Sequence, residues 1–347
     1  MTKIQQLVQV KNLKVYFPIT TTGLIRRKKG YVRAVDDVNF AIHRGETLGL
    51  VGESGSGKTT IGRSILRAVK ITQGKITFSI NDQVVELSSL SGKDLRNFRR
   101  HIQLIFQDPY SSLNPRMTVR DIIAEPLVAN NLVDKNKVDE MVQETALWCK
   151  LNIEHLRRFP HAFSGGQRQR ICIARALVSN PEFVVCDESV SALDVSIQAE
   201  ILNLLMDLQD ELQLTYLFIT HDLSVVAHIS DRVAVMYVGQ IVELASTDKL
   251  FTSPKHPYTE ALLSAIPEVD PDLEMKPVSL HGEIPNPANP PPGCRFHTRC
   301  PYVQDKCRLE EPQWREIDNN HFVSCHFTEE LDLKGVSMGV NVANHRS

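Results

Sequence analysis

The sequence predicts an α/β fold in which helices wrap a mainly parallel β-sheet. Short strands rich in apolar and β-branched residues recur at residues 182–188, 215–222 and 232–237. A helical pattern from Val195 to Leu212 separates the first two of these strands. Because parallel strands need a long crossover, alternating strands and helices are typical of a parallel sheet. A glycine-rich loop between a strand and a helix, at residues 52–59, agrees with this class.

The remaining elements follow in chain order. Residues 7–17 and 34–45 alternate apolar and polar side chains, which predicts antiparallel strands with one solvent-exposed face. Residues 46–52 form a short apolar strand that enters the glycine loop. The other predicted elements are strands at 75–80 and 101–107 and helices at 59–69, 118–150 and 256–267. Five prolines at 284–293 exclude a helix or an inner strand there.

Composition narrows the possible classes of protein. The chain has 347 residues, 42% hydrophobic and 23% charged, which suits a full domain plus a smaller one. A net charge of -2 argues against a nucleic-acid protein held by bulk charge. No apolar run reaches the roughly 18 residues that span a bilayer, and the N-terminus lacks the layout of a signal peptide. We therefore expect a cytosolic chain whose membrane-spanning helices, if needed, belong to another subunit.

The loop "GESGSGKT" fits the G-x-x-x-x-G-K-[ST] pattern between a strand and a helix. Its glycines allow a tight turn that brings backbone N–H groups onto phosphates. Lys58 would reach the β- and γ-phosphates, and the Thr59 hydroxyl would ligate Mg²⁺. The predicted ATP-binding residues here are Gly52, Glu53, Ser54, Gly55, Ser56, Gly57, Lys58, Thr59 and Thr60.

Polar side chains end three other predicted strands. Asp187 and Glu188 close "FVVCDE", at the strand end where open α/β sheets bind ligands. Asp187 would hold the Mg²⁺ shell, and Glu188 would polarise or deprotonate the attacking water. His221 in "FITHD" would contact the γ-phosphate, and the Gln107 amide in "LIFQDP" would face Mg²⁺ and the water. Singly these residues are weak signals; together they predict one hydrolytic site.

The stretch "FSGGQRQR", residues 163–170, is a second candidate phosphate-facing helix start. Free backbone N–H groups at a helix N-terminus attract anions. The simpler interpretation is that Ser164 caps a helix that begins near Gln167. The two interpretations are compatible.

The order of these motifs resembles that of ATP-binding cassette (ABC) ATPases, over about residues 7–330. "FSGGQRQRI", "VSALDVS", "HPYTEALL" and "GCRFHTRCP" are similar to the ATPase subunits of bacterial oligopeptide and dipeptide importers. The resemblance implies a RecA-like core sheet with an antiparallel β subdomain, a helical subdomain and a small Cys-rich C-terminal extension. It also implies that Phe17, or its neighbour Tyr16, stacks on adenine. Ser189 replaces the family's usual proline after Glu188, so we expect a modest effect on the geometry of Glu188.

The resemblance also implies the assembly. Residues Ser164, Gly165, Gly166, Gln167 and Asp194 would face the ATP bound by a second, homologous ATPase subunit, so that two chains enclose two ATP molecules. Gln107 would sense two transmembrane permease subunits, and an extracytoplasmic peptide-binding protein would deliver the cargo. The chain would then lie peripherally at the cytoplasmic face of the inner membrane. Import of nickel chelates or glutathione, or a soluble ABC ATPase without transport, are the alternatives.

The predicted organisation is a nucleotide-binding domain at 1–255, a C-terminal extension at 256–328 and a polar tail at 329–347. The odd number of cysteines, seven, and the lack of an export signal argue against a disulfide framework, and we expect Cys149, Cys172 and Cys186 to be buried thiols. The extension contains Cys294, Cys300, Cys307 and Cys325, whose spacing is wide for structural zinc. A 4Fe-4S cluster suits them better, as the resemblance implies for some members. The alternatives are zinc, with His297 or His326 as a further ligand, and four free thiols.

Overall fold

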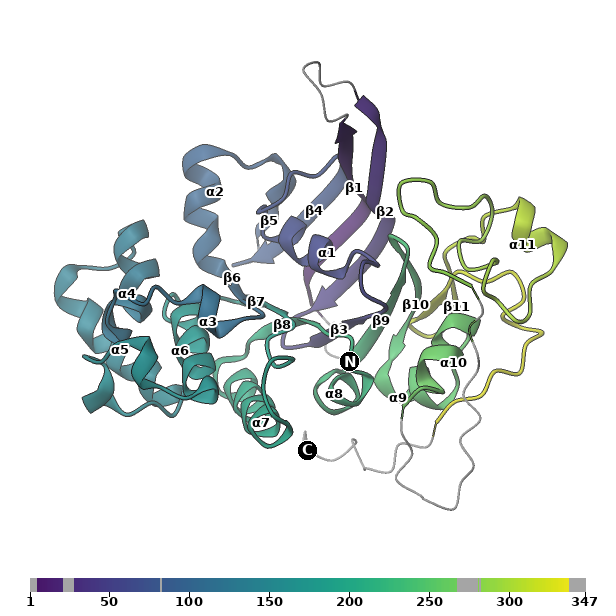
Figure 1. Cartoon of the computed structure of the whole chain (residues 1–347). Helices are drawn as coiled ribbons and strands as arrows, with labels where there is room; N and C mark the ends of the chain where they lie inside the picture. The colour runs from purple at the N-terminus through teal and green to yellow at the C-terminus, as the bar shows by residue number, and fades with distance from the viewer. Residues whose placement is uncertain (1–4, 21–27, 82, 267–279, 281, 337–347) are drawn as a thin grey trace. The chain divides into compact units, whose positions relative to one another are not determined.

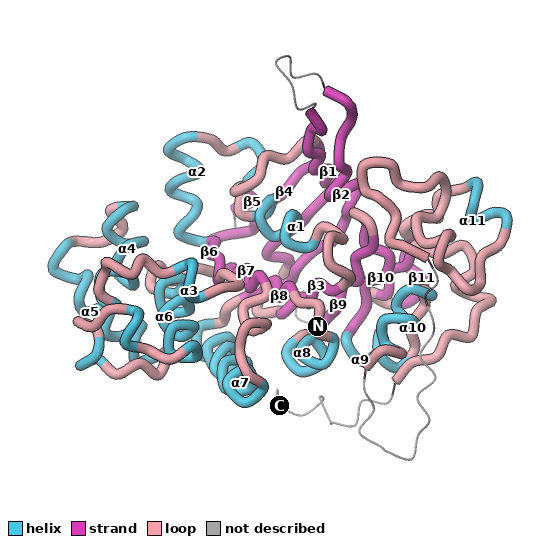
Figure 2. Tube along the Cα trace, viewed as in Figure 1, coloured by secondary structure: helices cyan, strands magenta, loops and turns pink. Residues whose placement is uncertain are grey.

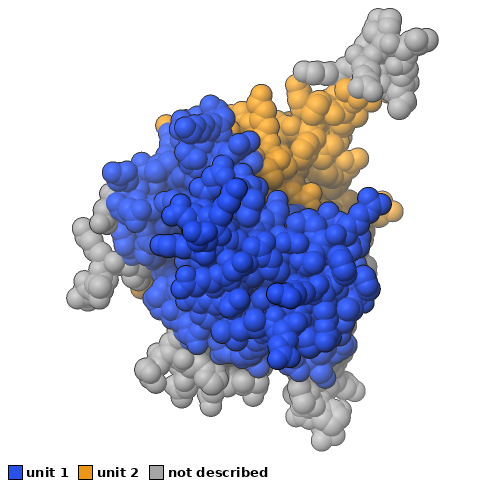
Figure 3. Space-filling model, turned by 90° about the vertical axis from the view of Figure 1, so that its left-hand side faces the viewer, with its two compact units in different colours: residues 1–8, 42–47, 77–219 blue, residues 9–41, 48–76, 220–347 orange. Residues whose placement is uncertain are grey.

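The computed structural model describes residues 5–20, 28–81, 83–266, 280 and 282–336. The chain forms two compact units, coloured separately in Figure 3. Unit 1 comprises residues 1–8, 42–47 and 77–219, and unit 2 comprises residues 9–41, 48–76 and 220–347. Each unit is therefore built from segments that are far apart in the sequence.

Unit 1 contains three neighbouring parallel strands: β6 (Ile102–Ile105), β7 (Phe183–Asp187) and β8 (Thr215–Ile219). Phe183 of β7 pairs with Ile102 on one side and with Thr215 on the other. All residues of β7 and β8 are buried, as expected for strands covered on both faces. The predicted parallel strands are confirmed here. Residues 77–80 of β4 (Gln73–Ile80) pair antiparallel with β5 (Gln83–Glu86).

The described residues of unit 1 form six α-helices, and Figure 1 shows α4, α5 and α6 beside one another. The predicted helical region 118–150 is confirmed as two helices, because Asn131 adopts a left-handed backbone (φ 50°) that ends α4. The helices are α2 (Gly92–Phe98), α3 (Pro109–Ser112), α4 (Val119–Asn130), α5 (Lys135–Trp148), α6 (Gly165–Leu177) and α7 (Val195–Leu212).

Unit 2 contains most of β1 (Gln6–Thr20) and β2 (Lys28–His43), which are neighbours in the same sheet as β4. A second group of strands runs in the order β11-β12-β10-β9-β3. Here β3 (Thr47–Val51) pairs parallel with β9 (Arg232–Tyr237), and the other pairs are antiparallel. The sequence did not predict β10 (Gln240–Ser246), β11 (Arg315–Asp318) or β12 (His321–Val323).

The helices in the described part of unit 2 are α1 (Lys58–Ile65), α8 (Leu223–Ile229), α9 (Thr247–Thr252), α10 (Pro257–Leu263) and α11 (Asp305–Leu309). The predicted short helix after His256 is α10, and its expected end at Pro267 lies outside the described residues. In Figure 2 the segment around α11 is mostly loop, in keeping with its prolines. Among the described residues, no helix is both long and apolar enough to span a membrane.

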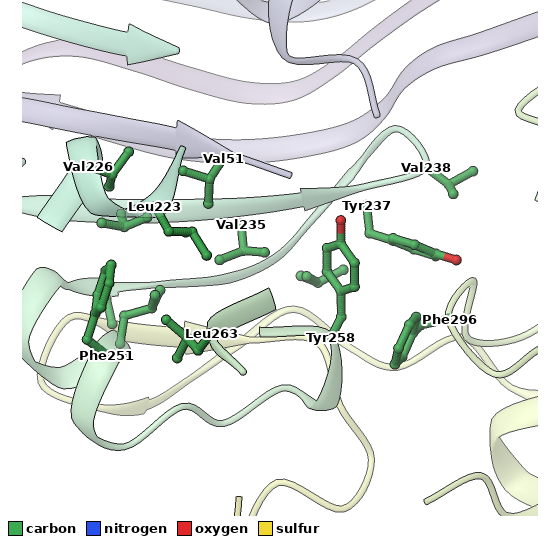
Figure 4. Close-up of a cluster of buried hydrophobic side chains, with 14 residues drawn as sticks. Val51, Leu223, Val226, Val235, Tyr237, Val238, Phe251, Tyr258, Leu263 and Phe296 are labelled. Atoms are coloured by element: carbon green, nitrogen blue, oxygen red, sulfur yellow. The ribbon is translucent and has the colours of Figure 1, made fainter. Parts of the chain in front are cut away.

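The core of unit 2 joins early and late parts of the chain (Figure 4). Val51 at the end of β3 shares a buried cluster with Phe251, Leu263 and Phe296. Residues beyond 255 thus pack on the same core as the strand before the glycine loop. The domain boundaries at 255 and 328 stay predictions, and residues 337–347 of the predicted tail lie outside the described residues.

Candidate functional site

The glycine loop after β3 depends on two glycines that no other residue can replace without strain. Gly52 has φ 145°, and an added Cβ would lie 2.1 Å from the Met236 carbonyl oxygen. Gly57 has φ 112°, and an added Cβ would lie 2.1 Å from the Ala34 carbonyl oxygen. Both backbone conformations disfavour L side chains, and the contacts are with backbone atoms that cannot rotate away. The loop is therefore fixed by close backbone packing.

Lys58 lies over this loop as the first residue of α1. Its side chain is buried, and Nζ donates to the carbonyl oxygens of Gly52 (2.7 Å) and Glu53 (2.9 Å). Gly239 N also donates to Ser56 O (2.8 Å), which ties the loop to the turn after β9. Ser54 and Gly55 at the loop tip are exposed. The loop thus presents an accessible tip backed by a buried cation, as a phosphate site requires.

Sequence reasoning missed two residues that contact the loop from the C-terminal part of unit 2. Arg299 makes a two-armed ion pair with Glu53 at 2.7 and 3.0 Å, which raises the pKa of Arg299. The Tyr258 hydroxyl accepts a hydrogen bond from Glu53 N at 2.9 Å. Arg299 lies in the motif "GCRFHTRCP" and Tyr258 in "HPYTEALL". Nothing in these motifs indicates that they contact the glycine loop.

In unit 1 the predicted carboxylates lie at the end of β7, with Asp187 as its last residue and Glu188 directly after it. Asp187 is buried and pairs in register with Ile219 of β8. Glu188 has a left-handed backbone (φ 50°), and its N–H donates to Ile219 O at 2.9 Å. Gln107, after β6, donates through Nε2 to Glu188 Oε2 at 2.6 Å. The structure therefore brings Gln107 and Glu188 together at one end of parallel strands.

The chain after Glu188 turns sharply into α7. Ser191 donates to the Glu188 carbonyl oxygen through both its N–H (3.2 Å) and its Oγ (2.9 Å). Asp194 caps α7 by accepting from Ile197 N at 3.0 Å. Ser189, where proline was expected, is buried. These contacts fix the backbone of Glu188 while its side chain reaches Gln107.

The helix start at Ser164 is a capping box. Ser164 Oγ accepts from Gln167 N (3.3 Å), and Ser164 N donates to Gln167 Oε1 (3.1 Å). An added Cβ at Gly166 would lie 2.6 Å from Ile197 Cγ2, so Gly166 lets α6 and α7 approach closely. The capping interpretation is confirmed, and α6 begins at Gly165. The predicted contact of this helix start with a second subunit's nucleotide stays a prediction.

The two candidates for stacking on adenine, Phe17 and Tyr16, and the predicted γ-phosphate contact His221 lie in unit 2. Phe17 is 41% exposed, whereas the Tyr16 hydroxyl donates to Asp36. Burial, followed by this hydrogen bond, raises the pKa of Tyr16 to about 12. Between the two candidates, Phe17 has the more accessible ring for stacking. His221 is exposed and directly precedes Asp222, whose side chain caps α8.

The cysteines divide as predicted into two groups. Cys149, Cys172 and Cys186 are buried free thiols, and burial raises the pKa of each. Cys294, Cys300, Cys307 and Cys325 are free thiols in the C-terminal segment, where Cys294 N donates to Cys307 O at 2.8 Å. Burial raises the pKa of Cys294 and Cys300 to about 12. Nevertheless, the described residues contain no group of three or more His, Cys, Asp or Glu side chains arranged to hold a metal ion.

The comparisons with known proteins agree with this geometry. The family described as ABC transporter matches residues 35–191, and the oligopeptide/dipeptide transporter C-terminal region matches residues 242–307. The chain is 50% identical over 325 residues to the oligopeptide transport ATP-binding protein AppF of Bacillus subtilis, covering 93% of this chain and 97% of AppF. It is 52% identical over 294 residues to a putative peptide import ATP-binding protein of Brucella ovis, covering 85% and 92%.

Solved structures give the same fold. The ATP-binding cassette MJ0796 bound to ADP and Pi matches with a TM-score of 0.59 and 27% identity, over 70% of this chain and 99% of MJ0796. The cbiO1 protein of Clostridium perfringens, part of the ABC transporter complex cbiONQ, matches with a TM-score of 0.60 and 25% identity, over 71% and 91%. The chain therefore belongs to the ATP-binding proteins of ABC transporters, in the oligopeptide/dipeptide group.

Proposed function

We propose that this chain hydrolyses ATP to power the import of di- or oligopeptides across the cytoplasmic membrane. The observation that carries the proposal is the Gln107–Glu188 hydrogen bond at the end of β7, in a chain that also holds a complete glycine loop. The peptide cargo rests on the names of the relatives, which are peptide transport proteins.

In the proposed site, the N–H groups of Gly52–Thr60 and the Lys58 ammonium bind the phosphates, and Phe17 stacks on adenine. The oxygen donors of Thr59, Asp187 and Gln107 suit Mg²⁺, which prefers oxygen ligands and would neutralise charge on the phosphates. Glu188 accepts the proton of the attacking water, and Gln107 orients this carboxylate. His221 contacts the γ-phosphate.

The same proposal includes a second, homologous ATPase subunit. Ser164, Gly165, Gly166, Gln167 and Asp194 would complete the nucleotide site of that subunit. A γ-phosphate shared by two chains favours the closed pair, and hydrolysis allows it to open. The capping box at Ser164 supports this role, because it orders the first N–H groups of α6.

Ser164→Arg tests the shared site. The bulky cation would occupy the γ-phosphate position, so hydrolysis by the assembled pair should fall roughly 100-fold. ATP affinity of the isolated chain, measured by fluorescence titration, should not change. A large loss of affinity in the isolated chain would instead assign this helix start to the chain's own site.

The proposed transporter also contains two permease subunits, an extracytoplasmic binding protein and this chain at the inner face of the membrane. The test is uptake of labelled peptides by proteoliposomes that contain the full complex, with and without ATP. ATP-dependent uptake of peptides supports the proposal. Uptake of a nickel chelate or glutathione but of no peptide would replace the cargo. Failure to co-purify with any permease would favour a soluble ABC ATPase.

We further propose that Cys294, Cys300, Cys307 and Cys325 bind a 4Fe-4S cluster with a structural role. The hydrogen bond from Cys294 N to Cys307 O and the position of the four cysteines in a loop-rich, proline-rich segment support this. His297 Nδ1 and His326 Nε2 contact the backbone oxygens of Cys294 and Glu310, as zinc-binding histidines often do through the ring nitrogen that does not bind the metal, so zinc is the alternative. Anaerobic purification with iron and sulfide assays tests the proposal, and stoichiometric zinc without iron would overturn it.

A further inference from the structure

The second residue of the glycine loop, Glu53, is held from outside the loop. Arg299 Nη1 and Nη2 donate to its two carboxylate oxygens at 2.7 and 3.0 Å, although 246 residues separate the pair. The Arg299 side chain is 7% exposed and that of Glu53 is 25% exposed. Parallel two-armed pairing fixes the direction of a carboxylate as well as its charge.

A second contact holds the backbone of the same residue. The Tyr258 hydroxyl, at the start of α10, accepts from Glu53 N at 2.9 Å. Tyr258 is fully buried and packs against Tyr237 and Phe296, with ring centroids 4.6 and 5.3 Å away (Figure 4). Arg299 also contacts Tyr237, with Cζ 5.9 Å from the ring centroid. The two side chains that contact Glu53, those of Arg299 and Tyr258, are therefore themselves held in place by packing against aromatic rings.

These contacts act directly on the proposed phosphate-binding groups. The Glu53 carbonyl oxygen accepts from Lys58 Nζ, so the position of Glu53 sets that of the lysine. An unpaired carboxylate on this loop would repel a triphosphate at close range, where the local dielectric constant is low. Arg299 neutralises it, and Tyr258 fixes the backbone of Glu53.

We propose that Arg299 and Tyr258 are positioning residues of the ATP site, which act through Glu53 by neutralising its charge and holding the glycine loop in its phosphate-binding shape. This inference rests on the proposed role of the loop. It assigns to the C-terminal region a direct effect on nucleotide affinity. The competing explanation is that Arg299 only attaches the C-terminal segment to the rest of unit 2.

The experiment measures affinity for a fluorescent ATP analogue in the full chain, and KM and kcat for ATP in the assembled complex. Arg299→Gln should weaken ATP binding about tenfold, since it leaves Glu53 charged and unpaired. KM should rise by a similar factor, with kcat within about twofold of wild type. Adding Glu53→Gln to Arg299→Gln should restore at least half of the affinity, because the repulsive charge is removed.

Arg308→Gln is the matched control, because Arg308 is exposed in the same segment and the change in net charge is the same. It should leave affinity unchanged. Tyr258→Phe, which removes only the hydroxyl, should weaken binding about threefold. If Arg299→Gln does not fold, Arg299→Lys is measured instead. Lysine keeps the positive charge but cannot make the two-armed pair with Glu53, so ATP affinity should fall roughly threefold.

Equal affinities for Arg299→Gln and Arg308→Gln would overturn the proposal. A loss that Glu53→Gln does not relieve would also overturn it, in favour of simple attachment. Lys58→Ala separates this outcome from failure of the site itself. If Lys58→Ala also bound ATP like wild type, the assignment of the glycine loop as the nucleotide site would be wrong.

Discussion

The glycine loop of unit 2 and the Glu188 turn of unit 1 differ in how they are held. The loop packs its glycines against backbone carbonyls, buries Lys58 and is fixed at Glu53 by Arg299 and Tyr258. The Glu188 side chain, in contrast, has an exposed hydrogen bond to Gln107. A hydrogen bond between exposed side chains is easily exchanged for another partner. The proposed phosphate-binding loop is thus fixed by packing, whereas the hydrogen bond between Gln107 and the proposed catalytic carboxylate is exposed to solvent.

The largest expected effect comes from Glu188→Gln. Removing the base should lower ATP hydrolysis by the assembled complex about 10²–10⁴-fold while ATP binding stays intact. Glu211→Gln, an exposed change of the same type, should leave turnover unchanged. Turnover is measured by phosphate release. Wild-type turnover in Glu188→Gln, with the matching change also made in the partner ATPase, would contradict the role of Glu188.

Gly57→Ala should destabilise the glycine loop of unit 2. A Cβ there meets the Ala34 oxygen at 2.1 Å in a left-handed backbone, so unfolding free energy should fall by roughly 2–5 kcal/mol. Gly55→Ala has the same sign of φ but nothing within 4 Å, and should cost only about 1–2 kcal/mol. Urea unfolding measures both. Equal costs would show that close packing does not fix the loop.

Acid should lower the unfolding free energy through His256, which contacts the Tyr258 that holds the glycine loop. Burial lowers the pKa of His256 to about 3, and neutral Nδ1 accepts from Tyr258 N at 3.0 Å. The unfolded chain, with an ordinary pKa near 6.5, takes up the proton first as pH falls. This contribution to stability is therefore complete above pH 6.5 and is lost between pH 6.5 and 3, by about 2 kcal/mol at pH 5.

The check compares unfolding at pH 7 and pH 5 in wild type and in His256→Asn. Asparagine offers an acceptor for the same N–H but does not titrate. The difference in unfolding free energy between the two pH values should shrink by about 2 kcal/mol in the variant. The same pH dependence in both proteins would show that His256 is not responsible.

The smallest expected effect is that of Ser189→Pro on the Glu188 turn. Proline restricts the unfolded chain, so a compatible substitution should stabilise the protein by roughly 0.5–1 kcal/mol. Turnover should stay within about twofold, because Ser191 already fixes the Glu188 carbonyl oxygen. A lower thermal midpoint in the variant would mean that this turn needs a backbone that proline cannot adopt.

Local signals in the sequence predicted much of this structure. The strand, glycine pattern and helix around Lys58 adjoin one another, so spacing alone identified the loop, and the strand ends located Gln107 and Glu188. The Arg299–Glu53 pair has no local signal, because its members are 246 residues apart. For the same reason β12, only three residues long, could not be told from a turn until its pairing with β10 was seen.

The pairing of β10 with β12 can form only late in the synthesis of the chain. Strand β10 is flanked by β9 and β12, and its Glu243 contacts His321, which is 78 residues further along the chain. A ribosome that adds about 5–20 residues per second leaves the β10 edge uncovered for about 4–16 s. An uncovered edge can pair with another nascent chain. The newly made protein therefore passes through an interval in which aggregation competes with completion of its sheet.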